Sequence, residues 1–143
     1  MTSEIPVPDP PAEHSWAEHV GELELHLLAD DEAGVFAAAV GAFGELLSDE
    51  ADGEIEEWQE VSAEGADRPV LLAAWLEELV FLAEHHGFVP TTVRDLRLDP
   101  TAVGGRVGGY RGRPPHLVKA VTYHRLAFER HEGRWRATLV LDV

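Results

Sequence analysis

Acidic and imidazole side chains near both ends of the chain have the types and spacing that could bind a metal ion. Glu18, His19 and Glu22 lie within one five-residue stretch, and Asp142 precedes Val143 at the end of the sequence. Oxygen ligands are what Ca²⁺ and Mg²⁺ prefer, and imidazole can bind a metal or transfer a proton. The stretch from Glu18 to Glu22, taken alone, is more often solvated surface, so a site depends on what the fold places around it.

Lys119 and His124 are two further polar residues in the C-terminal region. Lys119 is the only lysine in a chain with ten arginines. This indicates a position where a compact charge serves better than a planar guanidinium fork; an ordinary cation on a strand surface is the alternative. His124 lies in an apolar segment, where a histidine is more often a packed, hydrogen-bonded core residue than a ligand.

The last segment, residues 117–143, predicts a two-stranded hairpin, because apolar residues alternate with a period of two. Alternate positions of its first strand are Val118, Ala120, Thr122, His124, Leu126 and Phe128. In the second strand they are Trp135, Ala137, Leu139 and Leu141. Residues 131–133 form the turn, where Gly133 is free to adopt a positive φ.

Apolar residues at helical spacing predict two helices upstream. The first begins at Asp30–Glu32, whose acidic side chains cap free N–H groups, and ends at Ser48–Gly53. Further strands are predicted at 21–28, at 93–98 and in the glycine-rich stretch 101–111, which suits a twisted or bulged strand. Residues 54–61 form either an edge strand or an irregular connector.

The second helix begins with Asp67 as N-cap and Pro69 in its first turn. It runs to about His85, and Gly87 follows it as the residue that ends the helix. Its buried stripe consists of Leu71, Trp75, Leu79 and Leu82. Glu78 lies along this stripe, where it is either a paired structural carboxylate or a second-rank site residue.

The order of these elements predicts an α+β fold. Residues 1–13 contain four prolines and are expected to form a disordered leader, followed by one domain at 14–143. The predicted order is strand, helix, strand, helix and then several strands. This order indicates a mixed, mainly antiparallel sheet with two long helices packed on one face.

The charge is −16 and unevenly spread: residues 1–67 hold 19 acidic residues and no Lys or Arg, whereas residues 68–143 hold 11 basic and 8 acidic residues. The N-terminal half should repel nucleic-acid phosphates and favour cations or a basic protein surface; solubility, or adaptation to a salty cytoplasm, is the alternative reason for the acid. Arg106 and the loop 111–116 form the only cationic cluster. It lacks interleaved aromatics, so strong direct binding of nucleic acid is not expected.

The absence of cysteine excludes disulfides, thiolate metal sites and a cysteine nucleophile. No apolar run reaches the length of a membrane span, and the N-terminus lacks the basic and apolar pattern of a signal peptide. We therefore expect a soluble, cytoplasmic protein without a membrane partner.

Four sequence blocks together resemble the archease family over about Glu13 to Val143. KAVTYH at 119–124 precedes a Trp-bearing final strand with a hydrophobic-Asp-hydrophobic ending. LLAAWLEELV at 71–80 is similar to the family's helix LLVDWLNELL, and GFVP at 87–90 follows it. EHVGEL at 18–23 stands where the family carries DHTADV, so that Glu22 replaces the family's metal-site Asp.

The resemblance implies a metal site made of Glu22, Asp142 and an oxygen of Val143. Ca²⁺ is the expected cation, with Mg²⁺ or Mn²⁺ as alternatives. Because Ca²⁺ takes 6–8 oxygen ligands, these residues supply only part of the shell and binding should be weak. The second-rank functional residues are Glu18, His19, Lys119, His124 and Glu78.

The resemblance also implies a function without catalysis by this chain. Archeases are accessory proteins of the RtcB-type tRNA-splicing RNA ligase: they promote guanylylation of the ligase and allow multiple turnovers, while GTP and Mn²⁺ belong to the ligase. A tRNA methyltransferase is a second partner to consider.

Two alternatives come from other classes of protein. A small metal-dependent hydrolase could use Glu18, His19, Glu22 and Asp142, although the sequence contains no HExxH motif and no serine in a nucleophile elbow. The other alternative is a protein or RNA chaperone that needs no metal.

Overall fold

The computed structural model describes residues 12–48, 54–112 and 118–143. Most of the predicted leader lies outside these ranges, and Glu13 already belongs to a strand. The elements are β1 (Glu13–His19), β2 (Glu22–Ala29), α1 (Glu32–Leu47), β3 (Glu57–Glu64), α2 (Arg68–His86), β4 (Phe88–Leu98), β5 (Ala102–Arg111), β6 (Ala120–His131) and β7 (Arg134–Asp142).

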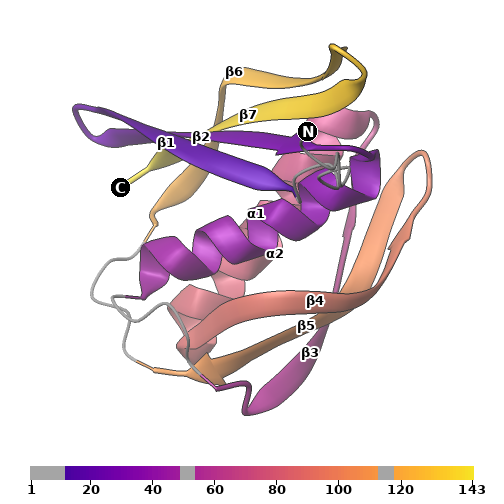
Figure 1. The fold of residues 1–143 in the computed structure, drawn as a ribbon. Helices are drawn as coiled ribbons and strands as arrows, with labels where there is room; N and C mark the ends of the chain where they lie inside the picture. The colour runs from indigo at the N-terminus through magenta and orange to yellow at the C-terminus, as the bar shows by residue number, and fades with distance from the viewer. Residues whose placement is uncertain (1–11, 49–53, 113–117) are drawn as a thin grey trace, which may run out of the picture.

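The strands form two antiparallel sheets, with strand orders β1-β2-β7-β6 and β3-β5-β4. Both helices lie between the sheets (Figure 1), where α1 packs mainly on β4 and β2, and α2 on β6 and β3. The predicted α+β class and antiparallel pairing are confirmed. The strands are divided between two sheets, however, so the helices cover one face of each.

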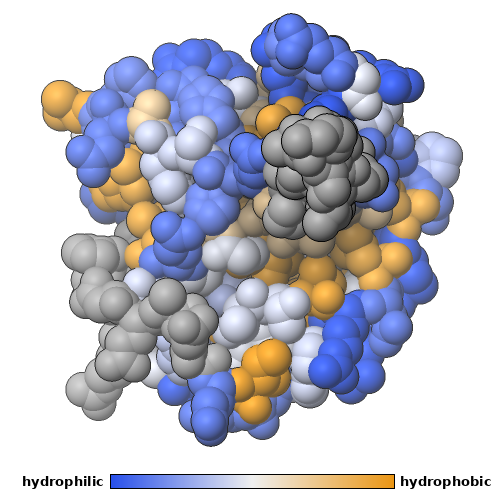
Figure 2. All heavy atoms as spheres, viewed as in Figure 1, coloured by the Kyte–Doolittle hydropathy of each residue, from blue (hydrophilic) through white to orange (hydrophobic). Residues whose placement is uncertain are grey.

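Each helix can pack against both sheets because it is apolar around most of its circumference. The buried residues of α1 are Val35, Phe36, Ala39, Val40, Ala42, Phe43, Gly44 and Leu47. At the centre, the fully buried Trp75 of α2 donates its indole N–H to the carbonyl oxygen of Phe36 at 3.1 Å, which joins the two helices. Figure 2 shows a band of hydrophobic side chains at the surface between the two sheets, beside α1.

The predicted helix ends are confirmed. Asp31 caps α1 by accepting a hydrogen bond from the Gly34 N–H, and Asp67 caps α2 by accepting one from the Val70 N–H. Gly87 ends α2 with a φ of 63°. Neither described helix is long and apolar enough to cross a membrane.

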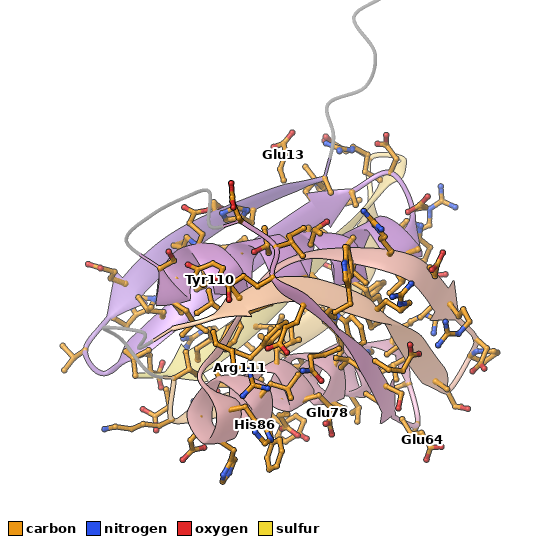
Figure 3. All side chains as sticks on the ribbon, turned by 90° about the horizontal axis from the view of Figure 1, so that it is seen from below. Glu13, Glu64, Glu78, His86, Tyr110 and Arg111 are labelled. Carbon is orange, nitrogen blue, oxygen red and sulfur yellow. The ribbon has the colours of Figure 1, made fainter. Side chains whose placement is uncertain are left out.

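The prediction that Glu78 lies in the buried stripe of α2 is wrong. Glu78 is exposed, although Leu71, Trp75 and Leu79 of the predicted stripe are fully buried. The buried side of α2 is wider than the predicted stripe, since it also includes Leu72, Leu76 and Val80, but it extends away from Glu78 and not toward it. Figure 3 labels Glu78 on α2.

The C-terminal hairpin forms as predicted around Glu132 and Gly133, with φ values of 52° and 79°. The predicted uniform alternation of its first strand is wrong. The register of β6 shifts between Thr122 and Ala127, and Arg125 in this bulge has a φ of 53°. The extra residues change which side chains face the core: Val121 is buried on one side of the bulge, and Phe128 packs against the core on the other.

Candidate functional site

Glu22 and Asp142 lie directly opposite each other in the ladder between β2 and β7. Directly paired residues of antiparallel strands place their side chains on the same face of a sheet. The main chain fixes this end of the sheet: the Val143 N–H donates to the Gly21 carbonyl oxygen at 3.1 Å, and the Lys119 N–H donates to the Asp142 carbonyl oxygen at 2.8 Å. The fold thus places both predicted carboxylates, and the main chain of Val143, at one sheet end.

This group lies on the outer face of the four-stranded sheet. Leu25 and Leu27 of β2 are buried toward the helices, and because side chains alternate, Glu22, Glu24 and His26 face the other way. His19 is the direct partner of Glu22 across the β1–β2 turn and shares its face.

Arg125 joins the carboxylates of this face. Its Nη2 is 3.3 Å from Glu22 Oε2, and its Nε is 3.4 Å from Glu24 Oε1. His124 Nδ1 lies 3.7 Å from Glu22 Oε1. The β6 bulge brings both residues to the face, and the side chain of His124 is 75% exposed. The favoured interpretation of His124 as a packed core residue is therefore wrong.

Glu24 is the most enclosed carboxylate of the group, with 14% of its side chain exposed. It accepts a hydrogen bond from His19 Nε2 at 3.1 Å. This hydrogen bond lowers the pKa of Glu24; partial burial opposes the shift, and the charges of Arg125, His26 and His19 add to it.

Sequence reasoning missed both Glu24 and Arg125. Glu24 could have been found, because it lies two residues after Glu22 in the alternating segment GELEL and must share its face. Arg125 could not have been predicted. It reaches the group only because β6 contains a bulge in which Arg125 has a positive φ, and no feature of the local sequence indicates that bulge.

The other predicted residues lie apart from this group. Glu18 is paired with Leu23, whose side faces the helices, so Glu18 points to the opposite face of the sheet from Glu22. Lys119 is exposed and precedes β6. Glu78 is on α2. The group on the outer face therefore contains His19, Glu22, Asp142 and His124 of the predicted residues, with Val143 beside them.

The Glu24→Gln variant tests the electrostatics of this face. Because folding lowers the pKa of Glu24, its charged form stabilises the fold above the ordinary value of 4.5, and this contribution is lost as the pH falls through the lowered pKa. At neutral pH the free energy of unfolding of the variant should be about 1 kcal/mol lower than that of the wild type. In acid the two free energies should become equal. Urea unfolding at several pH values measures this, and a difference that persists in acid would contradict it.

The oxygen donors at the sheet end are chemically suited to a hard cation, but they are few. In the part of the chain that the structure describes, no group of three or more His, Cys, Asp or Glu side chains is placed to hold a metal ion. Glu22 also faces Arg125. A cation here would have to compete with that guanidinium and take further oxygens from water or a partner.

Comparison with known proteins gives a consistent result. Residues 15–143 match the model of the Archease protein family (MTH1598/TM1083). Protein archease of Methanopyrus kandleri is 36% identical, over 88% of this chain and 96% of that protein. Protein archease of Pyrococcus abyssi is 30% identical, over 88% of this chain and 95% of its own length.

Two solved structures share the fold. The solution structure of Methanobacterium thermoautotrophicum protein 1598 has a TM-score of 0.77 at 23% identity and covers 91% of this chain and 98% of its own. The crystal structure of an archease, possible chaperone, from Thermotoga maritima has a TM-score of 0.66 at 16% identity and covers 89% of this chain and 94% of its own. The match over nearly all of the chain, together with these relatives, shows that this protein belongs to the archease family.

Proposed function

We propose that this protein is an accessory activator of an RtcB-type tRNA-splicing RNA ligase and not itself an enzyme. It would promote guanylylation of the ligase and sustain multiple turnovers. The observation that carries the proposal is the position of Glu22 directly opposite Asp142 at one end of the β2–β7 ladder in a member of the archease family. A tRNA methyltransferase would be a second partner of the same kind.

The charge distribution supports docking of this sheet end on a basic protein surface. Residues 1–67, which include β1 and β2, contain 19 acidic residues and no Lys or Arg. An RNA-binding protein presents basic surface, so this acidic half would be attracted to it. The carboxylates of Glu22 and Asp142 would then lie near the metal ions of the ligase.

A divalent cation would bind weakly at the same place, held by the carboxylates of Glu22 and Asp142 and a main-chain oxygen of Val143. Ca²⁺ suits this irregular oxygen set best, because its coordination is flexible, whereas Mg²⁺ demands near-ideal octahedral geometry. Mn²⁺ is a further alternative. The remaining ligands would come from water or from the partner.

The Arg125→Ala variant should bind Ca²⁺ more tightly than the wild type, by roughly 1.4- to fivefold, because an exposed ion pair is worth about 0.2–1 kcal/mol and the guanidinium competes for Glu22. Calorimetric titration measures this. Arg136→Ala is the matched control, since Arg136 pairs with Glu129 at 2.6 Å on the same sheet, away from Glu22. Unchanged affinity in the Arg125 variant would show that the cation does not use Glu22.

The direct test is a turnover assay of the RtcB-type ligase from the same organism, with and without this protein. We expect single turnover alone and multiple turnover with the protein added. The hydrolase alternative requires turnover by the isolated protein, and the structure weakens it, because Glu18 faces away from Glu22 and Asp142. Stimulation that survives complete chelation of added Ca²⁺ would favour the metal-independent chaperone.

A further inference from the structure

We propose that the outer face of the three-stranded sheet β3-β5-β4 binds a single-stranded polynucleotide through Trp58, Arg94 and Arg106. This proposal does not rest on the ligase function. The sheet lies on the opposite side of the helices from Glu22 and Asp142 (Figure 1), and Figure 3 views the molecule from the side where it lies.

The three side chains share one face because of the strand register. Trp58 of β3 is directly opposite Gly108 of β5, and Arg106, two residues earlier in β5, is directly opposite Arg94 of β4. Val107, between the two β5 positions, is fully buried toward the helices. Positions 106 and 108 therefore face outward, together with their cross-strand partners.

The indole of Trp58 lies against the backbone of Gly108. A Cβ at position 108 would be 2.8 Å from one carbon of the Trp58 ring and 2.9 Å from the next, so only glycine leaves room for the ring there. The Arg94 guanidinium carbon is 4.2 Å from the centre of the ring, and that of Arg106 is 5.7 Å away. The ring thus holds two guanidinium groups beside each other at the surface.

Neither guanidinium has a carboxylate partner among the residues that the structure describes, although the chain carries a net charge of −16. The described arginines that do pair with carboxylates are Arg68, Arg97, Arg111, Arg125, Arg134 and Arg136. Like charges directly opposite each other on a sheet face are destabilising. Arg94 and Arg106 are such a pair. Glu60 of β3 lies directly opposite Arg106 on its other side, but its carboxylate pairs with Arg97 at 2.6 Å. The two guanidinium groups over Trp58 are therefore available to an anion.

The chemistry of the face favours phosphate with an attached base. Guanidinium groups bind phosphate oxygens through paired N–H donors, and bases stack on aromatic rings and on guanidinium planes. Because Arg94 lies over the Trp58 ring, an incoming base would stack on that guanidinium, which the ring supports from below. An acidic peptide would use the guanidinium groups but not the ring. The sequence expectation of no strong nucleic-acid binding assumed that no aromatic residue is interleaved with the basic ones; β3 supplies that residue from a distant part of the chain.

The test is fluorescence anisotropy of labelled oligouridylate and oligothymidylate of about 12 nucleotides, within the roughly 4–16 that such sites cover, titrated with the full chain at low salt. The Arg94→Gln/Arg106→Gln variant should bind both oligonucleotides about tenfold more weakly. It should also reduce the slope of log affinity against log salt by about 1.4, since each neutralised phosphate of a single strand contributes about 0.7. Equal affinity for the two oligonucleotides would mean that the face recognises only phosphate and base. Tighter binding of the oligouridylate would mean that the face also contacts the 2′-hydroxyl.

The matched control is Arg130→Gln. Arg130 also stacks on a tryptophan, 5.5 Å from the centre of Trp135, but belongs to the other sheet, so its loss should leave binding unchanged. In the wild type, NMR should show the Trp58 indole N–H signal moving on addition of oligonucleotide, while that of buried Trp75 stays in place. This second measurement does not depend on a folded variant. The proposal would be overturned if the wild type did not bind either oligonucleotide, if the double variant bound equally well, or if the Trp58 signal did not move. It would also be overturned if the face bound polyglutamate, as a model of an acidic peptide, and no oligonucleotide.

Discussion

The Glu22→Gln/Asp142→Asn variant is expected to lose ligase stimulation by at least about tenfold while keeping its fold. Changing even an outer partner of a metal ligand typically costs roughly 10–100-fold, and this variant removes both carboxylates of the proposed site. The two side chains are partly exposed on the outer face at the end of one ladder, so amides of the same size should not disturb the core. Ligase turnover measures the effect, and thermal unfolding checks the fold.

Glu18→Gln is the control that the structure provides. Glu18 lies in the same hairpin as Glu22 and carries the same charge, but its side chain is on the opposite face of the sheet. Full stimulation by this variant, with loss in the double variant, would locate the activity on the outer face. Loss in both would indicate that general acidity of the hairpin, and not a site, attracts the partner. Retention in both would remove the carboxylate site from the proposed function.

Local sequence signals predicted the elements of this fold well because their causes are local. Asp31 and Asp67 cap helices through contacts three residues away, and Gly87 and Gly133 adopt the positive φ that each position needs. The alternation of leucines in β2 is a direct consequence of a sheet with one buried face. None of these inferences requires knowledge of what a segment packs against.

The arrangement of the elements depends on partners far along the chain, and there the sequence was a poorer guide. β1 went unpredicted because its residues are mostly polar, and only pairing with β2 makes it a strand. The division into two sheets depends on β5 pairing with β3 and β4 while β7 pairs with β2. The resemblance to a family suggested that Glu22 and Asp142 would meet; periodicity alone could not, since they are joined only through the β2–β7 register.

A single methyl group in α1 should test how tightly the helices are held between the sheets. In a helix interior, Gly→Ala normally stabilises by up to about 1 kcal/mol. At Gly44 the added Cβ would lie 1.9 Å from the Pro90 carbonyl oxygen of β4. That atom belongs to the backbone of a strand in the three-stranded sheet, so it cannot rotate away, and either the helix or β4 must move.

Gly44→Ala is therefore expected to lower the free energy of unfolding by about 1–3 kcal/mol or more, the usual cost of overpacking, and to lower the Tm by several degrees. Gly41→Ala is its matched control: the same substitution in the same helix, at an exposed position with no atom within 4 Å of the new Cβ, should raise stability by up to about 1 kcal/mol. Chemical denaturation of the two variants measures both effects. Opposite signs would show that α1 is fixed against β4 at Gly44, whereas stabilisation by both would mean that the helix can shift away from the strand at little cost.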